Sequence, residues 1–332
     1  MGGTDLKKHL KLLPALFALA GIAVVTGLVI YFGAADVGRA LASVRRGDFL
    51  LYLLVQIFIT LGLGLSWRML LRSRRRGSFW LCAWGRAVRD ATGEFLPFSQ
   101  VGGFVLGARV VAMGGVALAD AVASTLGDVT TEFLAQLAFI GVGLAILADK
   151  VPGSTLFMPV AIGLCVAVFA GIGLILAQRG SGARIFRALA QKIAGTTGEG
   201  TASHIDRLQE SLDSIYARRD RLALGASFHL LCWFGTAGAS YVGFRALGVP
   251  LSYIDAVCLE SMLHAIMALA FFIPGRVGIQ EATYTLLGAI FGIPPDLALS
   301  LSLLRRARDF VLAVPVLIAW QGLEAKKLKA AV

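Results

Sequence analysis

The chain has 332 residues, of which 57% are hydrophobic and 15% are charged, and its mean hydropathy is +0.78. A soluble domain normally carries about 25% charged residues, so this composition excludes an ordinary soluble protein. The formal net charge is +11. Because the basic residues gather beside apolar runs without a recognisable nucleic-acid-binding module, they predict cytoplasmic loops and contacts with anionic lipids, not nucleic-acid binding.

Four runs without a charged residue mark predicted membrane segments: 12–32, 49–67, 151–178 and 222–244. Each is close to the roughly 20 residues with which a helix crosses a hydrocarbon layer. They predict an all-α fold, a polytopic membrane helix bundle of about 7–8 spans. The whole chain, 1–332, is expected to form one integral membrane domain.

The first run follows three lysines, Lys7, Lys8 and Lys11. It contains 21 uncharged residues, and the apolar core of a cleaved signal peptide has only about 7–15. We therefore expect a signal anchor whose N-terminus lies in the cytoplasm.

The later elements follow in chain order from the apolar runs and their breaks. Spans are predicted at about 49–71, 118–148, 156–177, 222–245, 253–273 and 296–323. An outer loop is predicted over 33–48, a mixed helix over 79–94, and a segment interrupted by proline and glycines over 95–115. Arginines after the second span are interpreted as cytoplasmic topology determinants: Arg68, Arg72, Arg74, Arg75, Arg76, Arg86 and Arg89.

The polar region 181–220 predicts two amphipathic helices on the cytoplasmic surface. Its second part places apolar residues at helical spacing, Ile205, Leu208, Leu212 and Ile215. Ser203, followed three residues later by an aspartate, is typical of a helix start. A surface helix and a partner-binding helix are both compatible with this pattern.

Two stretches of the chain resemble each other, "PFSQVGGFVLGARVVAMGGVALADAVAS" and "PGRVGIQEATYTLLGAIFGIPPDLALS". In both, a Val-Gly pair after the proline is followed by an aspartate 18 residues beyond the glycine. This similarity predicts pseudo-repeat halves at about 46–150 and 222–323. The charge rule orients the halves oppositely, as in an inverted repeat. The motif positions are Pro97, Gly102, Gly103, Pro274, Gly275 and Gly278.

Interrupted helices inside inverted repeats are typical of transporters, because their exposed backbone ends line a central site. The two segments are therefore predicted to be broken or re-entrant helices, with kinked packing helices as the alternative. Strict inversion places the end of the last span outside, whereas Lys326, Lys327 and Lys329 favour the inside. The side of the C-terminus is left open.

Ionisable residues gather around the two segments. A charge at the centre of a bilayer costs about 2.5–3.5 kcal/mol on insertion scales, so such residues must be paired or hydrated. They indicate either internal salt bridges or a polar cavity whose arginines hold a phosphate-like group. The predicted substrate-binding residues are Arg109, Asp128, Glu132, Glu260, His264, Arg276, Glu281, Arg305 and Arg306.

No catalytic, metal or cofactor signature accompanies these charges. The sequence lacks GxSxG, HExxH, P-loop and dinucleotide motifs, which favours a protein that is not an enzyme and needs no cofactor. Glu260 and His264 supply only two metal ligands, so no metal site is predicted. His229 is alone in an apolar span and is interpreted as a core histidine. The cysteines are scattered and predict neither a disulfide framework nor a zinc site: Cys82, Cys165, Cys232 and Cys258.

The motifs "LPFSQVGGFVLGAR", "DVTTEF" and "PGRVGIQEATYTLLGAIFGIPPDLALSLSLLRRARDF" resemble the HpnL-type membrane proteins associated with hopanoid biosynthesis. That group lies within the flippase-like superfamily of the lysylphosphatidylglycerol synthase transmembrane region. The first motif lacks the superfamily's Gly-Glu pair and keeps only Arg109, whereas the second keeps Pro274, Arg276, Gly278 and Glu281. This departure weakens the case for an aminoacylated lipid substrate.

The resemblance implies a multi-pass protein of the bacterial inner membrane that moves or handles a lipid. The main hypothesis is a lipid flippase or transporter whose partners are membrane lipids, either hopanoids or anionic phospholipids. The alternatives are a non-catalytic scaffold for lipid-biosynthesis enzymes and an intramembrane headgroup transferase. Association with such enzymes and homo-oligomerisation are left open.

Overall fold

The computed structural model describes Thr26 and residues 34–71, 78–95, 99–178, 199–269 and 276–330, and its elements there are α-helices. The predicted all-α fold is confirmed for this part of the chain. The predicted span 12–32, apart from Thr26, lies outside the described residues, as do Pro97, Pro274 and Gly275.

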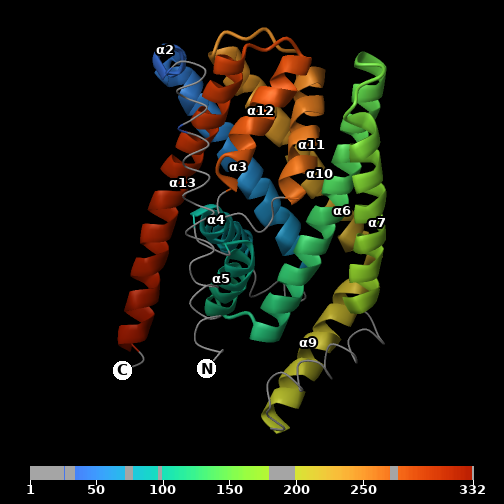
Figure 1. Ribbon diagram of the computed structural model, residues 1–332. Helices are drawn as coiled ribbons and strands as arrows, with labels where there is room; N and C mark the ends of the chain where they lie inside the picture. The colour runs from blue at the N-terminus through green and yellow to red at the C-terminus, as the bar shows by residue number, and fades with distance from the viewer. Residues whose placement is uncertain are drawn as a thin grey trace, which may run out of the picture.

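Long helices run through the bundle from end to end (Figure 1). Within the described residues, three are long and apolar enough to cross a membrane: α3 (Arg46–Leu70), α6 (Leu118–Lys150) and α10 (Arg219–Ala246). The apolar helix α7 (Phe157–Gln178) lies beside α6, and α13 (Pro295–Ala330) continues for 36 residues with Pro315 inside it. These helices match the predicted spans at their positions in the chain.

Two pairs of short helices occupy opposite halves of the molecule. The pair α4 (Phe79–Phe95) and α5 (Ser99–Met113) lies in the lower half, and the pair α11 (Tyr253–Leu269) and α12 (Ile279–Ile290) lies in the upper half (Figure 1). Residues early in α4 face residues late in α5, so this pair is antiparallel. α5 is one continuous helix, so the glycines of the predicted segment 95–115 do not break it, and Pro97 lies outside the described residues between α4 and α5.

The α4–α5 pair packs closely because glycines face the partner helix. A Cβ atom at Gly103 would lie 2.6 Å from the Arg89 carbonyl oxygen, and one at Gly107 would lie 3.3 Å from that of Gly85. At Gly102 the nearest atom, in Thr92, is 4.0 Å away. Gly103 and Gly107 therefore permit a close backbone approach here.

Helix contacts follow the same order in the two parts of the chain. α4 packs against α3, α5 and α13, while α11 packs against α10, α12 and α6. α3 and α10 pack against each other, with Ser66 of α3 donating a hydrogen bond to the carbonyl of Gly225 in α10. Each short pair thus lies against the long helix of the other part.

Two expectations about connecting regions are corrected. Residues 34–43 form a helix, α2 (Ala34–Ser43), where a loop was expected. The helix α9 (Glu199–Ala217) begins before Ser203, so that residue does not mark its start. α9 also contacts α6 and buries Leu212 and Ile215 against Leu70 and Ala123, whereas its predicted companion in 181–198 lies outside the described residues.

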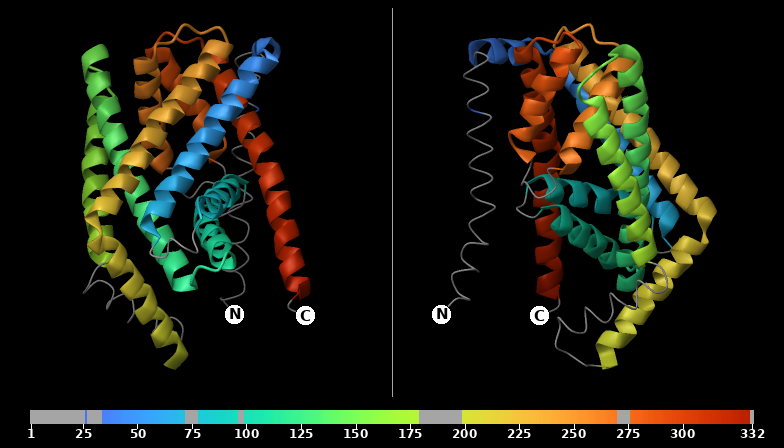
Figure 2. Two further views of the ribbon diagram at one scale, coloured as in Figure 1. Left: turned by 180° about the vertical axis from the view of Figure 1, so that it is seen from behind. Right: turned by 45° about the vertical axis from the view of Figure 1, so that its right-hand side comes forward.

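The turns that connect the helices lie at the two ends of the bundle. The end of α13 lies at the same end of the bundle as the α5–α6 turn and α9 (Figure 2). The α10–α11 and α12–α13 turns lie at the opposite end, near the start of α3. Each short pair therefore enters the bundle and returns to the same end.

We expect the α3–α4 contact to be sensitive to a single methyl group. In Gly64→Ala, the new Cβ would lie 2.5 Å from the Cα of Ala83, and backbone atoms cannot rotate away. Overpacking of this kind typically costs about 1–3 kcal/mol, so thermal unfolding of the purified protein in detergent should occur several degrees lower. Gly163→Ala, which meets nothing within 4 Å on α7, is the matched control and should not lower the Tm. Equal Tm values for the two variants would contradict this packing.

Candidate functional site

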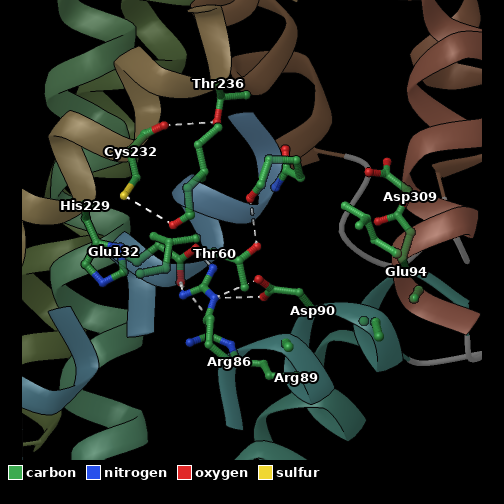
Figure 3. A pocket seen from close by; sticks show the side chains of 18 of the residues that line it. Thr60, Arg86, Arg89, Asp90, Glu94, Glu132, His229, Cys232, Thr236 and Asp309 are labelled. Atoms are coloured by element: carbon green, nitrogen blue, oxygen red, sulfur yellow. Dashed lines mark hydrogen bonds and ion pairs between the residues drawn. The ribbon is translucent and has the colours of Figure 1, made fainter. Parts of the chain in front are cut away.

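A cavity of about 720 Å³ lies between the long helices and the short helix pairs (Figure 3). Side chains of α3, α4, α6, α10, α11 and α13 line it, together with Arg276 just before α12. Two of its apolar lining residues are on the outer surface as well, Ile57, 40% exposed, and Trp80, 70% exposed. The cavity therefore combines a polar interior with an apolar edge.

A first ion-pair network joins α4 to α6 in the lower part of the cavity. Arg86 contacts Glu132 at 2.7 Å and Asp128 at 3.4 Å. Arg89 contacts the same two carboxylates at 2.5 Å and 2.7 Å. The ring of His229 on α10 reaches Asp128 through Nε2 at 2.9 Å. All five side chains are buried or nearly so. His229 is buried as predicted and has a partner at Nε2, but it lines the cavity and its buried Nδ1 has no hydrogen-bond partner among the described residues.

Helical spacing explains why α4 presents these cations together. Arg86, Arg89, Asp90 and Glu94 follow one another at intervals of three, one and four residues, which places them on one face of a helix. Arg86 and Arg89 are 4% and 6% exposed. Their interpretation as cytoplasmic topology determinants was wrong. In the sequence they follow a cluster of other arginines, and the cluster does not reveal that these two lie on the helix face that points into the bundle.

A second network surrounds Glu260 on α11. Its carboxylate contacts Arg305 of α13 at 3.0 Å and accepts hydrogen bonds from Ser240, at 2.5 Å, and from Tyr284 of α12. His264, one turn later on α11, lies 3.5 Å away. Glu260 is completely buried, so these partners replace the water that a carboxylate would otherwise need.

A third pair ties α12 to α13. Glu281 pairs with Arg306 and accepts a hydrogen bond at 2.8 Å from the backbone N–H of Gly278, at the start of α12. Gly278 has φ of 84°, a conformation that a residue without Cβ adopts without strain. A carboxylate at the beginning of a helix satisfies free N–H groups and matches the helix dipole. This pair therefore holds the start of α12.

In the first two networks, the paired residues occupy equivalent positions in their helices, but the signs of their charges are exchanged. Arg86 is the eighth residue of α4 and Glu260 the eighth of α11. Their partners Asp128 and Arg305 are the eleventh residues of α6 and α13. In both parts of the chain, a residue of a short helix thus forms an ion pair with a residue of a long helix. The short helix carries the cation in the first part and the anion in the second.

Two charged residues of the cavity wall do not belong to these networks. Neither the Arg276 guanidinium nor the Glu94 carboxylate has a hydrogen bond or ion pair with the described residues. Arg276 also has φ of 48°, the one positive φ of a non-glycine residue in the described part. A strained, unpaired cation at a cavity wall is a candidate for ligand binding.

The structure brings four of the predicted residues to the cavity wall, Glu132, His264, Arg276 and Arg305. The others lie elsewhere. Asp128 and Glu260 are fully buried behind their arginine partners, and Glu281 and Arg306 form the pair at the start of α12. Arg109, 52% exposed in its side chain, pairs with Glu324 near the end of α13 and does not line the cavity.

Other polar residues of the wall were not among the predicted substrate-binding residues. Several of them follow one another at helical spacing, so assigning residues to the faces of α4 and α13 would have found them. They include Arg86, Arg89, Asp90, Glu94, His229, Trp233, Arg308 and Asp309. Within the described residues, no group of three metal-ligating side chains comes together.

We expect Asp128 to be essential for the fold. In Asp128→Ala, Arg89 and His229 would keep their burial and lose their shared anion, a change that typically costs about 3–5 kcal/mol. Thermal unfolding in detergent should show a large fall in Tm. Glu324→Ala removes the partner of the exposed Arg109 and should leave the Tm nearly unchanged, because exposed ion pairs contribute little. Similar Tm values for the two variants would show that the network is not stabilising.

Comparison with known proteins agrees with the membrane architecture. The family described as the lysylphosphatidylglycerol synthase TM region matches residues 18–316 of the chain. This match covers both short helix pairs and the cavity between them. No curated protein matches the chain, and no solved structure matches it. The chain belongs to the family of the lysylphosphatidylglycerol synthase transmembrane region.

Proposed function

We propose that this membrane protein transports a lipid with an anionic headgroup, and that Arg276 binds the anion. The single observation that carries the proposal is the guanidinium of Arg276, which lies at the wall of a cavity between the helices and has no partner among the described residues. Arginine matches a phosphate with two parallel hydrogen bonds, and such a contact gains strength where water is scarce. An anion would thus supply the partner that the described residues do not.

The edge of the cavity suits the rest of a lipid. Ile57 and Trp80 line the cavity and face outward, so acyl chains can remain in the bilayer while the headgroup enters. Neither the sequence nor the described residues contain a recognised catalytic motif, and we propose movement of the lipid without chemical change. A phospholipid and a charged hopanoid derivative both satisfy this description, and the resemblance to hopanoid-associated proteins makes the second worth testing.

We further propose that the two parts of the chain are an inverted repeat. The matching helix order and the exchanged ion pairs support this proposal. The pairs α4–α5 and α11–α12 would then be re-entrant hairpins that enter the membrane from opposite sides, as in transporters that alternate between two openings. With two hairpins, the last helix returns to the side of the basic residues, which removes the conflict over the lysine-rich C-terminus.

A transport assay tests the role of Arg276. We expect the wild-type protein in proteoliposomes to move a fluorescent anionic phospholipid or a charged hopanoid reporter between leaflets, and Arg276→Gly to lose at least tenfold in rate, because a charge-assisted contact contributes about 1.5–3 kcal/mol. Glycine accepts the positive φ of this position, so the backbone should be undisturbed.

Arg109→Ala is the matched control, since it removes an arginine outside the cavity and should preserve the rate. If Arg276→Gly moves lipid as fast as wild type, Arg276 is not the anion-binding residue. If the folded and inserted wild-type protein moves neither lipid, the transport proposal is wrong, and a scaffold for lipid-biosynthesis enzymes becomes the better explanation.

The proposed topology makes a separate prediction in the bacterial inner membrane. On a background without the four native cysteines, Ala117→Cys in the α5–α6 turn and Pro294→Cys in the α12–α13 turn should react with a membrane-impermeant thiol reagent from opposite sides, since both residues are exposed and neither has a positive φ. Position 117 should be reached from the cytoplasm, on the side of the N-terminus. Labelling of both turns from one side would rule out hairpins of opposite orientation.

A further inference from the structure

The ion-pair network between α4 and α6 contains more acids than bases. It extends to Asp90, which contacts Arg86 one turn earlier on α4 at 2.9 Å (Figure 3). With this residue, two guanidiniums face three carboxylates, and the ring of His229 completes the group. We call these six residues the α4 network: Arg86, Arg89, Asp90, Asp128, Glu132 and His229. If the histidine is neutral and every acid is ionised, the α4 network carries one negative charge in excess.

Outside the α4 network, the cations and anions around the cavity are equal in number among the described residues. Two arginines form ion pairs with carboxylates, and one arginine and one carboxylate have no partner. These groups are Arg305 with Glu260, Arg308 with Asp309, and the unpaired Arg276 and Glu94. α3 and α5 line the cavity with uncharged side chains, and Cys232 of α10 and His264 of α11 are of types that are mostly uncharged at neutral pH. The excess of the α4 network is therefore not offset by the rest of the described wall.

An excess charge is unfavourable at this place because most of the α4 network is shielded from water. The side chains of Asp128 and His229 are completely buried, and an ionised group away from water is stable only when it is paired. A metal ion would need several oxygen ligands, but the oxygens of Asp128 and Glu132 already accept guanidinium hydrogen bonds. A proton needs one oxygen, so a proton is the cation that fits the α4 network.

Asp90 is the member best placed to take up this proton. Asp128 and Glu132 each contact both arginines of the α4 network, whereas Asp90 contacts Arg86 alone among the described residues. Hydrogen bonds to a carboxylate favour its ionised form, so the acid with the fewest is the easiest to protonate. The Asp90 side chain lines the cavity and is 39% exposed, so water can reach it. A second proton on the ring of His229 would lie on the buried Nδ1, which has no acceptor.

We propose that Asp90 binds a proton and that the anionic lipid crosses the membrane together with this proton. The inference rests on the proposed function and names the ion that drives it. An anion that approaches Arg276 meets an excess of negative charge while Asp90 is ionised, and the excess disappears when Asp90 is protonated. Proton and anion therefore each favour the binding of the other, and by the same factor. Water on one side supplies the proton that forms the Asp90 O–H bond, and water on the other side receives it.

Infrared spectroscopy of the full-length protein in detergent tests the proton site without any transport. At neutral pH, we expect the wild type to show the carbonyl stretch of a protonated carboxyl, and Asp90→Asn to lose this band. Glu94→Gln is the matched control, because it removes the next acid of the same helix face and should keep the band. The assignment is wrong if the wild type has no such band, if Asp90→Asn keeps it, or if Glu94→Gln loses it instead.

Proton movement in proteoliposomes tests the coupling to lipid. With a pH dye sealed inside and the membrane voltage held at zero, inward movement of the anionic phospholipid should acidify the interior by about one proton per lipid. In Asp90→Asn the number of protons per lipid should fall to near zero, because an amide does not exchange a proton at this pH. Asp255→Asn makes the same change in an exposed pair with Lys150 outside the cavity and should keep the wild-type ratio.

The two assays separate failure of the coupling from failure of the proposed function. A wild type that moves lipid without protons would overturn the coupling and leave the anion site of Arg276 intact. A wild type that moves no lipid would overturn the proposed function, and the coupling with it, whereas the infrared band would still decide whether Asp90 holds a proton. If Asp90→Asn moves no lipid, the infrared band decides the assignment of the proton in the same way.

Discussion

A charged side chain inside a membrane bundle must have a partner or water, and this constraint organises the centre of the molecule. Arg86 and Arg89 are buried against Asp128 and Glu132, and the pairing decides how α4 sits on α6. Glu260 fixes α11 relative to α13 in the same way. Removing one partner of such a pair costs far more than the pair contributes by itself. The short helices are therefore held in register by electrostatics as well as by close packing at glycines.

The same constraint separates structural charges from candidate functional ones. Charges with a complete set of partners, such as Glu281 at the start of α12, are explained by the fold. Arg276 and Glu94 line the cavity without such partners, and Arg276 holds a backbone conformation that an arginine rarely adopts. Local strain of this kind persists where the surrounding structure imposes it, and it concentrates at functional sites. The candidate site is thus defined by what the ion-pair networks leave unpaired.

The sequence predicted the long helices well, because uncharged runs of sufficient length have few other solutions. It also indicated the ionisable residues of the centre, since a charge in an apolar segment demands an explanation. The sequence did not predict the direction in which individual charged side chains point, because that depends on which helix face meets which neighbouring helix. Arg109 lies in a glycine-rich apolar segment like Arg276, yet α5 turns it outward. Arg86 lies after a basic cluster, yet α4 turns it inward.

The exchanged ion pairs have an electrical consequence. Each cation is compensated by an anion of its own half, α4 with α6 and α11 with α13, so a rocking movement of one half against the other would carry little net charge. A membrane voltage does work only on charge that moves across it, about 2.3 kcal/mol per elementary charge for every 100 mV. The framework would therefore respond weakly to voltage, and any voltage dependence would report mainly the charge of the bound lipid together with Arg276 and Glu94.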